Sequence, residues 1–365
     1  MNAKESVLSI MKTIGSEING PAATDPQIYD ESVYEVFLSA NSLALGEAYM
    51  DKKWDCNDLA GFYTKGLKQK LQIKKNIFTD PKLFLQSVFF NLQSKQRAFH
   101  VGEKHYDLGN DLYEATLGKH LLYTCDIWDG ARNLTEAQEK KMDRICRKLN
   151  LRPGQRLLDV GCGWGGLMRF AAMHYKVSCV GLSVSKEQTL YGREWCQGLP
   201  VEFIIADYRD YTDAEGFDHV SSIEMIEHVG QKNYRTYFEK IHELLKPGGT
   251  FMLQAIISPK KKPIADPWLD KYIFPNGVLS SPYQIEKNTR GLFHYEDLKN
   301  IGPDYDPTLM AWWENFEEAY PELVQKNPKY DERFYRMWKY YLQTCAALFR
   351  TEQLHDWQVL LKRTS

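Results

Sequence analysis

The stretch that decides the fold is LLDVGCGWGG, at residues 157–166. Its first four residues are mostly apolar, which is typical of a strand that is buried on both faces. Gly161, Gly163 and Gly165 follow at every second position. Glycine is favoured where a tight turn brings the backbone close to a ligand, because a Cβ would block the approach. The stretch therefore predicts a strand that ends in a ligand-binding turn.

The residues after the glycines, 167–175, have apolar side chains at helical spacing. A strand, a glycine turn and a helix in this order form a nucleotide-handling unit at the carboxyl end of a parallel sheet. The spacing is not GxGxxG, which argues against a bound dinucleotide. An ordinary turn that happens to contain glycines is the alternative interpretation, although four glycines cost backbone entropy without a gain in packing.

Strand and helix patterns alternate along the rest of the sequence. Strands are predicted at 177–182, 201–205, 219–223 and 251–257, with helical patterns between them, and the fold class would require a last edge strand at 358–362. This alternation predicts an α/β fold with a doubly wound, mostly parallel sheet.

Residues 1–95 predict a small all-α domain, because apolar side chains recur there at helical spacing. The end of this segment is rich in lysine, at Lys65, Lys68, Lys70, Lys74 and Lys75. One interpretation is a solvated helix face. The other is a basic surface that attracts anionic lipid headgroups.

Two segments interrupt the α/β alternation of the predicted catalytic domain, residues 96–365. Residues 258–291 contain lysines, prolines and an aromatic run, and we interpret them as an inserted lid. Residues 308–350 are helical in pattern and rich in Trp, Tyr and Phe. They predict a helical layer on the sheet, or, together with the lid, the wall of an apolar channel.

The composition limits the classes of protein that fit. The sequence has 365 residues, of which 43% are hydrophobic, enough for a large domain and a smaller one. A net charge of −2 argues against nucleic acid as a partner. The seven cysteines are scattered without a CxxC pair, which favours reduced thiols in the cytoplasm. Neither a secretory signal nor an apolar run long enough to span a bilayer is expected.

The segment DVGCGWGG, at 159–166, resembles the motif that binds S-adenosyl-L-methionine (AdoMet) in class I methyltransferases. Its WGG ending and the residues from about 105 to 363 are similar to the cyclopropane-fatty-acyl-phospholipid synthase family. The resemblance implies a seven-stranded sheet and transfer of a methylene group from AdoMet to the cis double bond of unsaturated acyl chains in membrane phospholipids. It also implies a bicarbonate ion as general base, a homodimer, and a peripheral position on the cytoplasmic face of the membrane.

The candidate cofactor residues follow the carboxyl ends of the predicted strands, where ligands bind in doubly wound sheets. They are Asp159, Gly161, Gly163, Gly165, Leu182, Ser183, Gln188, Asp207, Tyr208 and Arg209. The resemblance adds Tyr123 and Thr124 from a segment that caps the cofactor.

The candidate catalytic residues come from the resemblance. The run EHVG at 227–230 matches the family, in which the Glu is one wall of a bicarbonate pocket. The corresponding walls here are Cys125, Glu227, Gln254, the backbone of Ile256, and Tyr305.

Two positions depart from the family pattern. Gln254 stands where the family usually has His; Gln forms hydrogen bonds but cannot carry a proton as His does. Glu224 stands where many relatives have a small residue, and its charge would raise the pKa of neighbouring carboxyl groups.

These departures leave other functions open. The first is a C-methyltransferase of acyl chains that yields methyl-branched or methylene lipids without closing a ring. A catalytically silent protein that binds AdoMet or lipid ranks lower. A nucleic-acid methyltransferase also ranks lower, because residues 224–227 read EMIE where amino-group DNA enzymes carry a D/N-P-P-Y/F motif.

Overall fold

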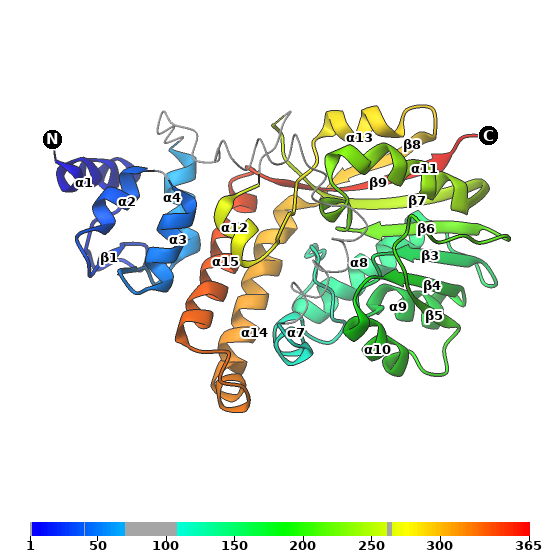
Figure 1. Ribbon diagram of the computed structural model, residues 1–365, viewed down its shortest axis with the longest axis horizontal. Helices are drawn as coiled ribbons and strands as arrows, with labels where there is room; N and C mark the ends of the chain where they lie inside the picture. Colours follow the sequence, from blue (N-terminus) through cyan, green and yellow to red (C-terminus); the bar gives the residue numbers. More distant parts are fainter. Residues whose placement is uncertain (1, 40, 70–107, 261–264) are drawn as a thin grey trace.

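A computed structural model describes residues 2–39, 41–69, 108–260 and 265–365 (Figure 1). A seven-stranded sheet has the order β5-β4-β3-β6-β7-β9-β8. Its strands are β3 (Arg156–Val160), β4 (Ser178–Ser183), β5 (Val201–Ile205), β6 (Phe217–Ile223), β7 (Leu245–Ile257), β8 (Phe293–Asn300) and β9 (His355–Arg363). The first five strands in the order are parallel, and β9 runs antiparallel to both β7 and β8. The predicted α/β fold with a mostly parallel seven-stranded sheet is confirmed.

Helices cover both faces of the sheet. Because strand side chains alternate between faces, Leu157 packs with the apolar sides of α8 (Leu134–Lys148) and α9 (Gly166–Tyr175), whereas Leu158 packs with α11 (Tyr234–Leu244). Helix α10 (Lys186–Trp195) lies against β4 and β5. The polypeptide goes from β3 outward to β5 and then returns to β6, so the strand order reverses between β3 and β6. A doubly wound sheet binds its ligands at the carboxyl ends of the strands beside this point.

The edge strand β8 is absent from the predicted strands. Beyond Phe293 its residues are exposed, and its sequence FHYEDLKN has no apolar run. It pairs only with β9 within the described sheet. Charged, solvent-exposed edge strands protect a sheet against further pairing, and they lack the apolar signal of interior strands.

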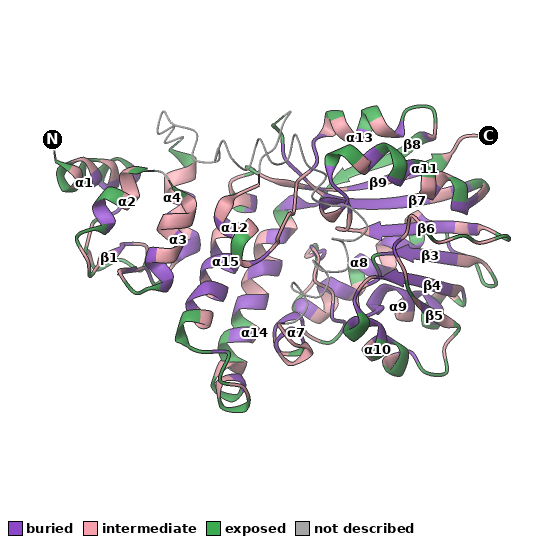
Figure 2. Cartoon of the chain, viewed as in Figure 1, coloured by how far each residue is buried: buried purple, intermediate pink, exposed green. Residues whose placement is uncertain are grey.

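The aromatic segment forms two long helices, α14 (Tyr305–Lys326) and α15 (Glu332–Arg350), which stand between the N-terminal helices and the sheet (Figure 1). Figure 2 shows buried residues along both helices. Their aromatic side chains belong to one hydrophobic cluster that also contains Trp54, Leu59 and Phe62. Most of the aromatic residues are therefore core, as the helical-layer interpretation requires.

The N-terminal region contains four described helices and a two-residue strand pair. They are α1 (Ala3–Ile14), β1 (Gln27–Ile28), α2 (Val33–Ser39), α3 (Ser42–Met50), β2 (Trp54–Asp55) and α4 (Leu59–Lys68). Gln343 of α15 accepts a 2.9 Å hydrogen bond from the backbone of Leu59, and the hydroxyls of Tyr63 and Tyr340 lie 2.6 Å apart. The predicted boundary at residue 95 lies outside the described residues.

The segment interpreted as a lid contains α12 (Pro267–Tyr272) and α13 (Pro282–Thr289). Trp268 of α12 is buried against Gly46 and Tyr340, so α12 is anchored in the hydrophobic cluster that contains the aromatic side chains of α14 and α15. The remaining described elements are α7 (Asn110–Leu117) and the short helices η1 (Ile226–His228), η2 (Gln231–Asn233) and η3 (Gly302–Asp304). Within the described ranges, no helix is long and apolar enough to cross a membrane.

Candidate functional site

The glycine turn after β3 has the conformation that its sequence predicts. Gly161, Gly163 and Gly165 all have positive φ angles, of 84°, 54° and 87°. A Cβ on Gly163 would meet no heavy atom within 4 Å, so this turn leaves open space for a ligand. A Cβ on Gly165 would instead lie 2.3 Å from Phe203. The requirement for glycine at 165 therefore comes from its backbone angle and from helix–strand packing.

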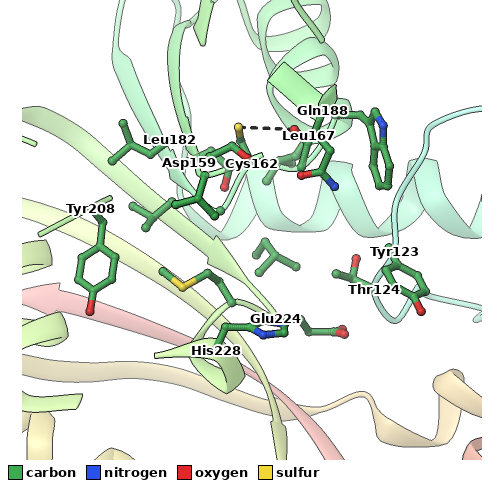
Figure 3. A pocket seen from close by; sticks show the side chains of 18 of the residues that line it. Tyr123, Thr124, Asp159, Cys162, Leu167, Leu182, Gln188, Tyr208, Glu224 and His228 are labelled. Carbon is green, nitrogen blue, oxygen red and sulfur yellow. Dashed lines mark hydrogen bonds between the residues drawn. The ribbon is translucent and has the colours of Figure 1, made fainter. Parts of the chain in front are cut away.

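One cavity lies at the carboxyl ends of β3, β4 and β6 (Figure 3). Except for Gly165, all the predicted cofactor residues line it: Tyr123, Thr124, Asp159, Gly161, Gly163, Leu182, Ser183, Gln188, Asp207, Tyr208 and Arg209. In Figure 3 the glycine-turn side of the cavity carries Asp159, Cys162 and Gln188, and the opposite side carries Glu224 and His228. Tyr123 and Thr124 close one end.

Polar side chains in this cavity suit a nucleoside. Asp159 is 4% exposed, and Ser221 Oγ donates to its Oδ1 over 2.8 Å. Burial raises the pKa of Asp159 to about 7, so a hydroxyl or amine donor in the cavity would favour its ionised form. Arg209 holds Asp207 through its backbone N–H at 2.9 Å and through Nε at 2.8 Å. Together with the amide of Gln188, these groups fit the ribose and adenine of AdoMet.

Three of the five predicted catalytic residues, Cys125, Gln254 and Tyr305, converge on one carboxylate, which belongs to Glu224. Oε1 of Glu224 accepts hydrogen bonds from the backbone N–H of Cys125 and from Gln254 Nε2, each at 2.8 Å. Its Oε2 accepts from the hydroxyl of Tyr305 at 2.6 Å. Glu224 lines the cavity, whereas Cys125, Gln254 and Tyr305 stand behind it.

Glu227 and Ile256 form a second contact beside this group. The backbone N–H of Ile256 donates to Glu227 Oε1 over 2.7 Å, while Glu227 Oε2 has no hydrogen-bond partner among the described residues. Burial, followed by the charge of Glu224, raises the pKa of Glu227 to about 8. A neutral Glu227 is therefore the main form at pH 7. The charge of Glu224 thus raises the pKa of a neighbouring carboxyl group, as the sequence predicts.

Three further polar residues belong to the site, and the sequence analysis does not identify them. Asp356 of β9 is fully buried, and its Oδ2 accepts from Gln254 Nε2 at 2.9 Å. Lys141 Nζ lies 2.8 Å from Asp126 Oδ1, and both side chains are almost completely buried. Lys141 also donates to Thr124 Oγ1 over 2.5 Å.

One signal in the sequence marks Lys141. It stands four residues after Ala137 and four before Ile145, both of which are buried in α8, so it occupies the apolar face of that helix. A lysine on such a face needs a buried partner. Asp356 offers no comparable signal, because only the antiparallel pairing of β9 with β7 brings it to Gln254.

Aromatic rings surround the same end of the cavity. The ring centroid of Tyr123 lies 5.4 Å from that of Tyr113 and 5.3 Å from that of Trp312. The hydroxyl of Tyr123 donates to that of Tyr341 over 2.9 Å. Tyr305 stacks on Phe349 with ring centroids 4.4 Å apart. The site around Glu224 therefore combines aromatic rings with the ionisable groups of Lys141, Glu227 and Asp356.

The sheet topology and the glycine-lined cavity at its switch point define a class I AdoMet-dependent methyltransferase. Residues 93–359 match the model of the mycolic acid cyclopropane synthetase family. The chain belongs to this family.

Relatives of the protein agree with this assignment. The cyclopropane-fatty-acyl-phospholipid synthase of Escherichia coli K12 is 45% identical over 355 residues, which cover 97% of this chain and 92% of that protein. A tuberculostearic acid methyltransferase of Mycobacterium tuberculosis is 32% identical over 341 residues, covering 88% of this chain and 79% of that protein.

Solved structures show the same fold. A cyclopropane synthase from Mycobacterium tuberculosis is 28% identical, with a TM-score of 0.67, and the match covers 73% of this chain and 98% of that one. A mycolic acid cyclopropane synthase complexed with S-adenosylhomocysteine (SAH) and CTAB is 26% identical, with a TM-score of 0.66 and the same coverage. This protein is an AdoMet-dependent methyltransferase, and AdoMet is its cosubstrate.

Proposed function

We propose that the protein is a cyclopropane-fatty-acyl-phospholipid synthase, which transfers a methylene group from AdoMet to the cis double bond of unsaturated acyl chains in membrane phospholipids. The observation that carries the proposal is 45% identity to the Escherichia coli enzyme of that name over nearly the whole sequence. The arrangement of the cavity supports it, because the residues that fit the nucleoside of AdoMet and the carboxylate of Glu224 line the same space.

The protein's residues contribute orientation and exclusion of water. Gly161, Gly163 and the side chains of Asp159 and Gln188 would hold the nucleoside, with Glu224 on the opposite side of the cavity and Tyr123 at one end. Holding the alkene and the methyl donor in line removes much of the entropic barrier to their reaction. An alkene needs no protein nucleophile for this step, since its own π electrons attack.

Positive charge then develops on an alkene carbon, and the surroundings of the cavity can stabilise it. Tyr123 lines the cavity, and its ring supplies a negatively polarised face. It packs on Trp312, which packs in turn on Tyr305, the residue whose hydroxyl donates to Glu224. The carboxylate of Glu224 adds a full negative charge. Ring closure requires a base that removes one proton from the new methyl group. The family resemblance assigns this role to bicarbonate, held by Cys125 and other residues.

The lipid substrate implies work at a membrane surface, and we propose that the protein acts there as a peripheral cytoplasmic enzyme and as a homodimer. Two of the predicted docking lysines lie in described residues. Lys65 Nζ donates to the carbonyl of Gly15 and to Thr24 Oγ1, each at 2.7 Å, so it has an internal role. Lys68 is exposed at the end of α4, whereas Lys70, Lys74 and Lys75 lie outside the described residues.

A C-methyltransferase that acts on acyl chains is the second candidate. The observation that favours this candidate is Glu224, because an extra carboxylate at the site changes which group can accept a proton. The test is incubation of the purified protein with AdoMet and vesicles of dioleoyl phosphatidylglycerol and phosphatidylethanolamine. We expect fatty esters with cyclopropane protons in the NMR spectrum. Methyl-branched or methylene esters would instead support the second candidate, and failure to form any new ester from either lipid would contradict both.

A further inference from the structure

We propose that the carboxylate of Glu224 takes the place of bicarbonate in this protein and accepts the proton that is released at ring closure. The inference rests on the proposed function, and it names the group that acts as base in that reaction. Its evidence is the set of hydrogen-bond donors that meet at one side chain.

The donors come from three separate segments. Cys125 precedes α8, Gln254 lies in β7 and Tyr305 begins α14, and each donates to Glu224 at 2.8, 2.8 and 2.6 Å respectively. These are three of the residues that the family resemblance places around the ion. A backbone N–H and a hydroxyl each have one hydrogen to donate, and both are directed at Glu224. A separate anion would therefore have to compete with the protein's own carboxylate for the same donors.

The backbone at Glu224 is strained. Its φ angle is +50°, in the left-handed region that glycine adopts easily and other residues rarely do. The backbone N–H of Glu224 donates to the carbonyl of Gln254 over 2.8 Å, so the pairing with β7 holds the residue in this conformation. A glycine would fit this position with less strain. A strained residue at the edge of a cavity points to a function for its side chain.

The neighbouring carboxyl groups leave the negative charge on Glu224. Burial raises the pKa values of Glu224, Glu227 and Asp356. Glu224 accepts three hydrogen bonds, and hydrogen bonds to the charged form favour ionisation. Glu227 Oε2 and Asp356 Oδ1 have no hydrogen-bond partner among the described residues. Of these three carboxyl groups, Glu224 therefore has the best-stabilised ionised form, and the ionised form is the one that accepts a proton.

In the proposed step, each bond that forms is matched by a bond that breaks. A bond forms between one alkene carbon and the methyl carbon as the bond between methyl and sulfur breaks, which leaves positive charge on the second alkene carbon. Glu224 then accepts one proton from the new methyl group. The electron pair of that C–H bond forms the last bond of the ring. The protonated Glu224 returns its proton to water after the products leave.

The experiment compares the wild-type protein with Glu224→Gln, which keeps the size of the side chain, and with Glu224→Gly, which frees the three donors. Glu352→Gly is the matched control for backbone strain, because Glu352 is an exposed residue with a φ angle of +55°. Each protein is assayed with AdoMet and dioleoyl phosphatidylglycerol vesicles in carbonate-free buffer, and again with added bicarbonate. Binding of ¹³C-bicarbonate in the presence of SAH is measured by NMR without turnover.

We expect the wild type and Glu352→Gly to form cyclopropane esters at the same rate with and without bicarbonate, and to bind no bicarbonate in the cavity. Glu224→Gln should lose about 100-fold or more in turnover while its AdoMet affinity stays within about twofold. Glu224→Gly should bind bicarbonate, and its residual turnover should rise when the ion is added.

Two results would overturn the inference. The first is wild-type cyclopropane formation that stops in carbonate-free buffer and returns with bicarbonate; the proposed function would then stand while the assignment of Glu224 fails. The second is full turnover by Glu224→Gln. If the wild-type protein forms only methyl-branched esters, no ring closes. That result would contradict both the proposed cyclopropane synthase activity and the role of Glu224 as the base for ring closure.

Discussion

The hydroxyl of Tyr305, the first residue of α14, donates a 2.6 Å hydrogen bond to Oε2 of Glu224, which follows the last residue of β6. This contact ties the aromatic helix pair to the carboxyl end of the sheet. It also orients the carboxylate toward the cavity that is lined by the predicted AdoMet residues. The helical layer therefore has a role in the site as well as in the core.

We expect Tyr305→Phe to lower turnover about tenfold to 100-fold with little change in AdoMet affinity, because one oxygen of Glu224 loses its donor. The stacking on Phe349 is retained in this variant. Steady-state kinetics and calorimetric titration with AdoMet check the prediction. Tyr340→Phe is the matched control: it removes a buried 2.6 Å hydroxyl contact with Tyr63, away from the cavity. Equal losses of turnover in the two variants would contradict a specific role for Tyr305.

Gly163→Ala should weaken AdoMet binding at least about tenfold while the protein stays folded. The added Cβ would meet no protein atom within 4 Å and would project into the space left for the ligand. Gly154→Ala is the control, because Gly154 is exposed, has a φ angle of +83° and is equally free of neighbours. Both variants carry a similar backbone strain, of about 1–2 kcal/mol. Calorimetric titration should therefore show loss of affinity only for Gly163→Ala.

Lys141→Met should destabilise the protein by about 3–5 kcal/mol, because it leaves the buried carboxyl group of Asp126 without its cation. The double variant Lys141→Met/Asp126→Asn removes that charge, and we expect it to recover most of the loss. Chemical denaturation of the three proteins measures the difference. If the double variant is as unstable as the single one, the ion pair is not the source of the effect.

Glu227→Gln should make the stability of the protein less dependent on pH. Burial and Glu224 raise the folded-state pKa of Glu227 to about 8, from an ordinary value of 4.5. The folded state therefore binds this proton more tightly than the unfolded state. The stability that this proton contributes is fully present below pH 4.5 and is lost as pH rises to 8. The loss is about 1.4 kcal/mol per pH unit at most.

Thermal unfolding at several pH values tests this sign. The unfolding temperature of Glu227→Gln should exceed that of the wild type by more at about pH 8 than at about pH 5. Glu243→Gln, on the exposed side of α11, is the control and should show no such trend. A constant difference between Glu227→Gln and wild type across the pH range would be incompatible with a raised pKa at Glu227.

Replacing Lys68, Lys70, Lys74 and Lys75 together by Gln should weaken sedimentation with anionic phosphatidylglycerol vesicles. Each lysine near such a surface contributes about 1 kcal/mol, and added salt screens this attraction. Neutral phosphatidylcholine vesicles are the control. Lys65 is left unchanged because its ammonium group binds Gly15 and Thr24. Binding that is insensitive to both salt and the substitutions would contradict electrostatic docking.

Several features of the fold could be predicted from local sequence, and others could not. The interior strand β4 (Ser178–Ser183) lies within one residue of the predicted range 177–182. The edge strand β5 (Val201–Ile205) has the mostly apolar sequence VEFII and lies at the predicted residues. The edge strand β8 could not be found this way, since seven of its eight residues are exposed and polar or charged side chains predominate. An edge strand forms because a neighbour offers free backbone groups, and its own sequence needs no apolar pattern.

The sequence by itself determined the alternation of the parallel strands with helices and the position of the glycine turn. Both depend on short-range properties: apolar periodicity selects the element, and positive φ angles select glycine at residues 161, 163 and 165. The family resemblance further selected the residues that are expected to surround the reaction centre.

Only the tertiary structure decided what those residues surround. Cys125, Gln254, Tyr305 and Asp356 are far apart in the sequence. The pairing of β7 with β6 and β9 brings Gln254 to Glu224 and to Asp356, whereas Cys125 and Tyr305 reach Glu224 from outside the sheet. The sequence marks Glu224 as a departure from its relatives, but hydrogen-bond geometry shows that its carboxylate takes the donors predicted for an ion. Burial in that shared site, which no local pattern reports, then sets the pKa values of its carboxyl groups.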